Sequence, residues 1–152
     1  MKYALIGCGR IATNHIKAVL NNGLELVAVC DIVPEHMETL LAKHGLENEA
    51  SILRYTDYRK LLAQHPELEL VAIATESGLH AQIALACIDA GVNVIIEKPI
   101  AMCMADAEEI IRRSKEKGVT VCACHQNRFN VAVQKTRQAL EAGRFGRLSH
   151  GS

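Results

Sequence analysis

Residues 3–12, with the sequence YALIGCGRIA, constrain the fold of this chain more than any other segment. A short apolar run ends at Gly7, a turn with two glycines follows, and a helical pattern of apolar residues begins at Ile11. Gly7 permits a sharp turn, Gly9 leaves room for a pyrophosphate beside the main chain, and Ala12 permits close packing of helix on strand. Free N–H groups at the helix start bind phosphate. The segment therefore predicts a dinucleotide-binding turn.

The second apolar run of the chain ends at Asp31, 22 positions beyond Gly9. An acidic residue about 20 positions after such a turn accepts hydrogen bonds from the adenosine ribose of a dinucleotide. It also repels a 2′-phosphate, and the next residues, Ile32 and Val33, are not basic. We therefore expect NAD as the cofactor, with NADP disfavoured. The alternative is that Asp31 only shapes a loop or caps a helix before Pro34.

Apolar strand patterns alternate with helical patterns along the whole chain. Continuous apolar runs such as residues 70–74 suit parallel strands that are buried on both faces, and repeated strand–helix units predict a doubly wound α/β sheet, the Rossmann fold. The expected strands are residues 2–7, 25–30, 53–55, 70–75, 92–97 and 119–124. The expected helices are residues 10–21, 34–44, 57–64, 79–90, 104–117 and 130–142.

The composition argues against several classes of protein. Lys and Arg number 17, as do Asp and Glu, so the net charge is zero, and no basic cluster with interleaved aromatic residues predicts a nucleic-acid partner. No apolar run approaches the ~20 residues of a membrane span, and the N-terminus does not resemble a signal peptide. The six cysteines include no CxxC pair. We therefore expect reduced thiols, no metal site, no membrane partner and a cytoplasmic protein.

The fifth expected strand ends in the sequence Glu-Lys-Pro, residues 97–99. Ligands of a doubly wound sheet bind outside the carboxyl ends of its strands. Four residues fall at such ends: Gly7, Asp31, Thr75 and Lys98. Lys98 is thus a candidate for chemistry, although a lysine after a strand is more often an ordinary solvated side chain.

Four motifs occur in order and at familiar spacings: GCGRIA at 7–12, TESGLH at 75–80, EKP at 97–99 and HQNRF at 125–129. In this combination the chain closely resembles the N-terminal half of the Gfo/Idh/MocA oxidoreductases. These are NAD(P)-dependent dehydrogenases that act mainly on sugars and cyclitols. The resemblance implies NAD as cofactor, a sugar or sugar-nucleotide substrate, and hydride transfer between a secondary alcohol of that substrate and NAD.

The resemblance also implies roles for individual residues. The cofactor-binding residues are expected to be Gly7, Gly9, Arg10, Ile11, Asp31, Thr75, Glu76, Ser77, Leu79, His80, Glu97, Lys98 and Gln126. The substrate-binding residues are expected to be Lys98, Asn127 and Arg128. Lys98 is the expected catalytic residue, and the bond that joins it to Pro99 is often cis in this family.

Some positions leave two interpretations open. Glu76 stands where many relatives have proline, and it binds a ribose hydroxyl or faces solvent. His80, at a helix start, holds the loop by hydrogen bonds to the main chain or contacts the cofactor. Four further histidines, in or beside helices, are interpreted as surface or packing residues: His15, His36, His44 and His65.

We expect residues 1–147 to form the dinucleotide-binding domain and residues 148–152 to begin the first strand of a missing C-terminal substrate domain. The resemblance implies that this second domain carries an Asp/His pair, most of the substrate pocket and a sheet used for homo-oligomerisation. The chain alone is therefore expected to be inactive. The QNRF segment at residues 126–129 resembles that of relatives that oxidise carbon 3 of UDP-linked N-acetylhexosamines or their uronic acids. The alternatives are an inositol or free-sugar dehydrogenase, a non-catalytic NAD-binding regulatory module, and a scaffold that binds no nucleotide.

Overall fold

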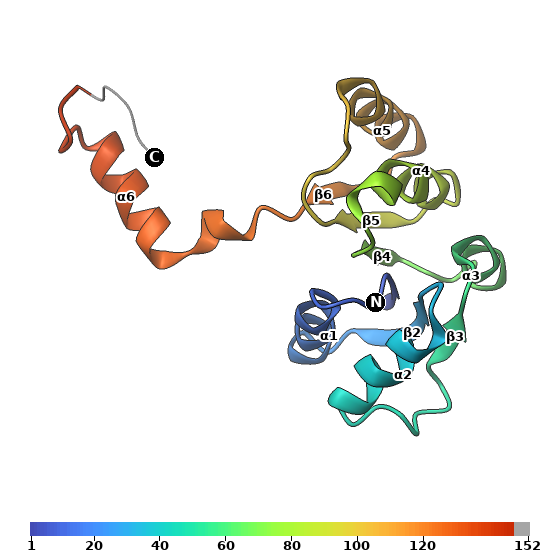
Figure 1. The fold of residues 1–152 in the computed structure, drawn as a ribbon. Coiled ribbons are helices and arrows are strands. Elements are labelled where there is room, and N and C mark those ends of the chain that lie inside the picture. Colours follow the sequence, from blue (N-terminus) through green and yellow to red (C-terminus); the bar gives the residue numbers. More distant parts are fainter. Residues whose placement is uncertain (148–152) are drawn as a thin grey trace.

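Six parallel strands form one sheet in the order β3-β2-β1-β4-β5-β6, at the centre of a computed structural model that describes residues 1–147 (Figure 1). The strands are β1 (Lys2–Ile6), β2 (Glu25–Cys30), β3 (Leu53–Tyr55), β4 (Leu70–Ile73), β5 (Asn93–Ile96) and β6 (Val121–Ala123). The α-helices are α1 (Ala12–Asn21), α2 (Pro34–Lys43), α3 (Tyr58–Gln64), α4 (His80–Asp89), α5 (Met104–Lys117) and α6 (Val131–Glu141). Two short 3₁₀ helices are η1 (Ser77–Leu79) and η2 (Gln126–Phe129).

Helices cover both faces of the sheet, because the central strands are apolar on both faces. On one face, buried residues of α3, α4 and α5, such as Leu61, Ile83 and Ile110, pack against strand residues such as Ile73. On the other face, α1 and α2 pack against the sheet with residues that include Ile16. These two layers give the doubly wound fold that the sequence predicts.

The strand order reverses between β1 and β4, which are neighbours although two strands separate them in the chain. Ile6 pairs with Ile73, so these two strands end at the same level. After β1 the chain leads to a helix on one face of the sheet, and after β4 it leads to a helix on the other face. At such a switch point a crevice opens at the carboxyl ends of the two strands. The fold therefore places a ligand site above β1 and β4.

All six expected strands and all six expected helices are present, and most of them are shorter than expected by one or two residues at an end. The largest difference is β6, which covers Val121–Ala123 where residues 119–124 were expected. Helices η1 and η2 were not expected, because segments of three or four residues are too short to show a helical period. The expected strand at residues 148–152 lies outside the described residues.

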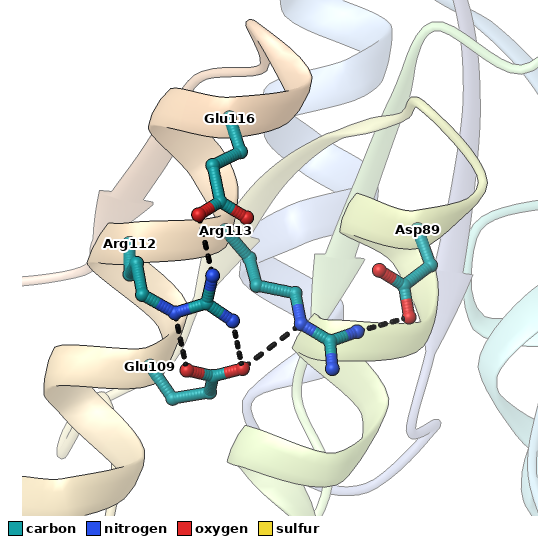
Figure 2. Close-up of polar contacts among 5 residues, drawn as sticks. All are labelled: Asp89, Glu109, Arg112, Arg113 and Glu116. Carbon is teal, nitrogen blue, oxygen red and sulfur yellow. Dashed lines mark hydrogen bonds and ion pairs between the residues drawn. The ribbon is translucent and has the colours of Figure 1, made fainter.

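A network of charged side chains joins α4 to α5 (Figure 2). Two nitrogens of Arg112 donate to Glu109 at 2.8 and 2.7 Å, and a third binds Glu116. Arg113 donates to Glu109 at 2.9 Å and to Asp89, the last residue of α4, at 2.5 Å. Hydrogen bonds from Arg112, then from Arg113, lower the pKa of Glu109 to about 2. The network fixes α5 against α4 from the solvent side.

The segment of η2 and α6 lies away from the layers of the sheet (Figure 1). None of the side chains of α6 is buried, and Phe129 is 77% exposed. Residues 130–142 were expected to be helical, and this is confirmed apart from one residue at each end. Within residues 1–147, none of the helices combines the length and the apolar character that a membrane span requires.

Candidate functional site

The turn after β1 has the backbone shape that the glycine motif predicts. Gly7 has φ of +95°, a conformation that favours glycine. A Cβ atom on Gly7 would lie 2.5 Å from the carbonyl carbon of Ala74, at the end of β4. A Cβ atom on Gly9, in contrast, would have no protein atom within 4 Å. Gly7 is thus required by the fold, whereas the space beside Gly9 is open to a ligand.

Helix α1 begins directly after this turn and has no side-chain cap. Ile11 occupies the N-cap position, and the first turn holds no acidic residue. The N–H groups at the start of a helix lack partners within the helix, and the positive end of the helix dipole lies there. This combination can bind the phosphate groups of a dinucleotide.

Asp31 follows β2 and faces the same turn. Its Oδ2 atom accepts a 2.7 Å hydrogen bond from the backbone N–H of Cys8, and its Oδ1 atom accepts a 2.9 Å bond from that of Val33. Nδ1 of the more exposed His36 lies 3.2 Å from Oδ1. A carboxylate has about four acceptor positions, so Asp31 keeps capacity for a ribose hydroxyl.

A cavity of about 320 Å³ lies above the carboxyl ends of β1, β2 and β4. Six of the expected cofactor residues line it: Gly7, Gly9, Asp31, Thr75, Glu76 and Leu79. The wall does not include four others that were expected along the cofactor: Arg10, Ile11, Ser77 and His80. The open space beside Gly9, the uncapped helix and the acid at the rim fit the diphosphate and ribose of NAD.

The cavity wall also holds residues that the sequence did not point to. His36, interpreted from the sequence as a surface or packing residue, lies on the wall beside Asp31. Thr56 and Tyr58 also line the cavity. They follow β3, and their position just after a strand of the parallel sheet is the sequence signal that could have indicated them.

The thiols beside the cavity are not reactive. Burial, and next the negative charge of Asp31, raise the pKa of both the Cys8 and the Cys30 thiol to about 12. A neutral, buried thiol is a poor nucleophile. These two cysteines therefore act as small apolar residues of the core.

A second hollow, of about 410 Å³, lies at the carboxyl ends of β5 and β6. It brings together Lys98, Gln126, Asn127 and Arg128, the expected nicotinamide and substrate residues, with the unexpected His125. The side chain of Lys98 is exposed there. The peptide bond between Lys98 and Pro99 is cis, as the resemblance implies.

Two expected cofactor residues lie beneath the surface of the site. His80 is only 1% exposed, and its Nδ1 and Nε2 atoms lie 2.7 and 3.1 Å from the carbonyl oxygens of Pro99 and Thr75. This is the loop-holding arrangement considered for His80. Glu97 is also buried, and its carboxylate faces Nε2 of His15 at 3.0 Å. His15 is therefore a buried partner of the EKP motif.

The strand order, the glycine turn and the acid after β2 define a dinucleotide-binding domain. Comparison with known proteins assigns this domain to a family. Residues 1–125 match the family model described as the Gfo/Idh/MocA oxidoreductase family, NAD-binding Rossmann fold. The chain belongs to this family.

Similar proteins include dehydrogenases with several substrates. A 4-carboxy-2-hydroxymuconate-6-semialdehyde dehydrogenase of a Sphingobium species is 31% identical, over 94% of this chain and 44% of its own length. An inositol 2-dehydrogenase of Salmonella paratyphi B is 28% identical, over 99% of this chain and 45% of its own length. The chain thus spans less than half the length of these relatives.

Among solved structures, the WlbA dehydrogenase of Bordetella pertussis, in complex with NADH and UDP-GlcNAcA, is similar to the described fold. It superposes with a TM-score of 0.85 at 36% identity, over 97% of this chain and 44% of that one. The family and the expected Rossmann fold are therefore confirmed.

Proposed function

We propose that the protein that carries this chain oxidises a secondary alcohol of a sugar or sugar nucleotide, with NAD as hydride acceptor. The observation that carries the proposal is the position of Lys98. This lysine is exposed in the second hollow, at the same carboxyl edge of the sheet as the cavity, with Gln126, Asn127 and Arg128 around it. An amine and a guanidinium in one hollow suit a polar, anionic or hydroxyl-rich substrate.

When bound, NAD would accept the hydride from the substrate carbon. The residues of the chain hold the cofactor and manage the charge of the reacting alcohol. Gly7, Gly9 and the start of α1 bind the diphosphate, and Asp31 binds the adenosine ribose. Arg128 and Asn127 orient the substrate. The hydride passes to NAD, and the hydroxyl proton passes to a histidine of the second domain that the resemblance implies. The ammonium group of Lys98 donates a hydrogen bond to the reacting oxygen and stabilises the negative charge that develops on it as this proton leaves.

A sugar nucleotide is the substrate class that we favour. The support is the 36% identity to the WlbA dehydrogenase that was solved with UDP-GlcNAcA. An inositol is the second candidate, because the Salmonella relative is an inositol 2-dehydrogenase.

We further propose that the protein is a homo-oligomer in the cytoplasm without a nucleic-acid partner. The balanced charge argues against a nucleic-acid partner. The six unpaired thiols suit a reducing compartment. The homo-oligomer rests on the family resemblance.

The test is NADH fluorescence with the intact protein, UDP-GlcNAcA and myo-inositol as substrates, and the variant Lys98→Ala. The proposal predicts turnover with UDP-GlcNAcA and a fall of about 100-fold or more in Lys98→Ala, because one charge-stabilising donor is lost. NAD affinity should change much less. Lys115→Ala, on the exposed side of α5, is the control and should keep full turnover. Unchanged turnover in Lys98→Ala would remove this lysine from the mechanism.

A further inference from the structure

A buried hydrogen bond lies behind the lysine of the proposed reaction. The Glu97 carboxylate accepts a 3.0 Å bond from Nε2 of His15, and the two side chains are only 10% and 9% exposed. A carboxylate accepts hydrogen bonds and an imidazole N–H donates them, so we assign the proton of this bond to Nε2 of His15. The bond joins α1, the helix of the glycine turn, to the residue directly before Lys98.

The main chain around Lys98 is held on both sides. The backbone N–H of Glu97 donates to the carbonyl of Ile73 at 3.0 Å, so β4 holds the residue before the lysine. The carbonyl of Pro99, the residue after it, lies 2.7 Å from Nδ1 of His80. The bond from His15 adds a side-chain anchor on the first of these two residues.

The pocket around Glu97 contains a third polar group. Burial, and next the negative charge of Glu97, raise the pKa of the Cys124 thiol to about 11. The thiol is therefore neutral and brings no charge to compensate the carboxylate. The Glu97 carboxylate thus has two neighbours that donate to it, the ring nitrogen of His15 and, more weakly, the thiol of Cys124.

We propose that His15 is a positioning residue for the reaction at Lys98. Its bond to Glu97 fixes the turn that presents the lysine, while His15 itself lines neither the cavity nor the second hollow. This inference rests on the proposed function of Lys98. The competing view is that the bond only fastens α1 to the sheet.

The experiment compares two amides of different reach in the intact protein. In His15→Gln the amide nitrogen occupies a position close to that of Nε2, whereas in His15→Asn it ends near Nδ1 and cannot reach Glu97. His15→Asn should lower kcat with UDP-GlcNAcA about 10-fold or more, because small misplacements of a reacting group are costly. His15→Gln should stay within about threefold of the wild type.

Two controls separate the loss of a positioning contact at Lys98 from a general disturbance of α1. ADP lacks both the nicotinamide and the ribose that carries it, so its affinity reports the α1 side of the site alone, and it should be unchanged in His15→Asn. His44→Asn removes another histidine contact of α1, the 2.8 Å bond between Nε2 of His44 and Oγ1 of Thr13, and should keep full turnover.

Equal turnover in His15→Asn and His15→Gln overturns the inference. A loss of ADP affinity that matches the loss of kcat also overturns it, because the bond then serves α1 as a whole. Lys98→Ala is measured beside them. If it is fully active, the proposed role of Lys98 fails and that of His15 fails with it; if it is inactive while His15→Asn is fully active, only the role of His15 fails. Absence of turnover in the wild type contradicts the proposed function itself.

Discussion

The backbone N–H of Cys8 donates a 2.7 Å hydrogen bond to the carboxylate of Asp31. The turn after β1 and the end of β2 therefore hold each other in place before any cofactor binds. In the proposed function Asp31 therefore has two tasks: it orders the main chain that would face the diphosphate, and its remaining acceptor capacity would serve the ribose.

Alanine at Gly7 and at Gly9 should have opposite effects. Gly7→Ala combines a φ of +95° with a Cβ atom 2.5 Å from the Ala74 backbone. We expect it to lower the free energy of unfolding by about 3 kcal/mol. The Cβ atom that Gly9→Ala adds has no protein atom within 4 Å. It should leave stability within about 0.5 kcal/mol and weaken NAD binding about 10-fold or more.

Urea unfolding and NAD titration of both variants check this pair. Gly9→Ala with wild-type NAD affinity would show that the diphosphate does not approach the main chain at this position.

His80→Phe should destabilise the protein. The ring keeps its approximate shape but leaves the carbonyl oxygens of Thr75 and Pro99 without their buried partner. Loss of partners for buried polar groups predicts a decrease of about 2 kcal/mol or more in the free energy of unfolding. Urea unfolding measures it, and a midpoint equal to that of the wild type would contradict the role of His80 in holding the loop.

The ion network on α5 should give a pH-dependent contribution to stability. The pKa of Glu109 is about 2 in the folded protein and 4.5 ordinarily, so between these values the unfolded chain binds more protons. The contribution is complete above pH 4.5 and is lost as the pH falls toward 2.

The measurement is the difference in Tm between the wild type and Glu109→Gln as a function of pH. The wild type should have the higher Tm at pH 7, and the difference should shrink at low pH and at high salt. Glu108→Gln, on the same helix, is the control. A difference between the wild type and Glu109→Gln that grows on acidification would contradict the assigned pKa.

The sequence predicts the parts of this molecule whose signals are local. The apolar pattern predicts the strand and the helix within residues 2–21, and the two glycines predict the turn between them. The sequence predicts that Asp31 and Lys98 belong to the site because both stand at strand ends, and parallel strands bring their carboxyl ends to one edge of the sheet. The hollow that joins Lys98 to residues 126–128 follows from the same rule.

Other features depend on packing across long sequence separations. The bond between His15 and Glu97 joins residues 82 positions apart, and it requires the crossing of α1 over the sheet to be known. The contact of His36 with Asp31 depends on the rotation of α2 about its axis. For α6, the apolar period indicates a helix, but it does not give the position that this helix takes relative to the sheet.

The most direct test of the account is calorimetric titration of the intact protein and of Asp31→Ala with NAD and NADP. We predict saturable binding of NAD, at least about 10-fold tighter than NADP, because the carboxylate accepts from the ribose and repels a 2′-phosphate. In Asp31→Ala this preference should disappear, mainly through weaker NAD binding. Equal affinity of the wild type for both cofactors, or a preference for NAD that survives in Asp31→Ala, would contradict the account.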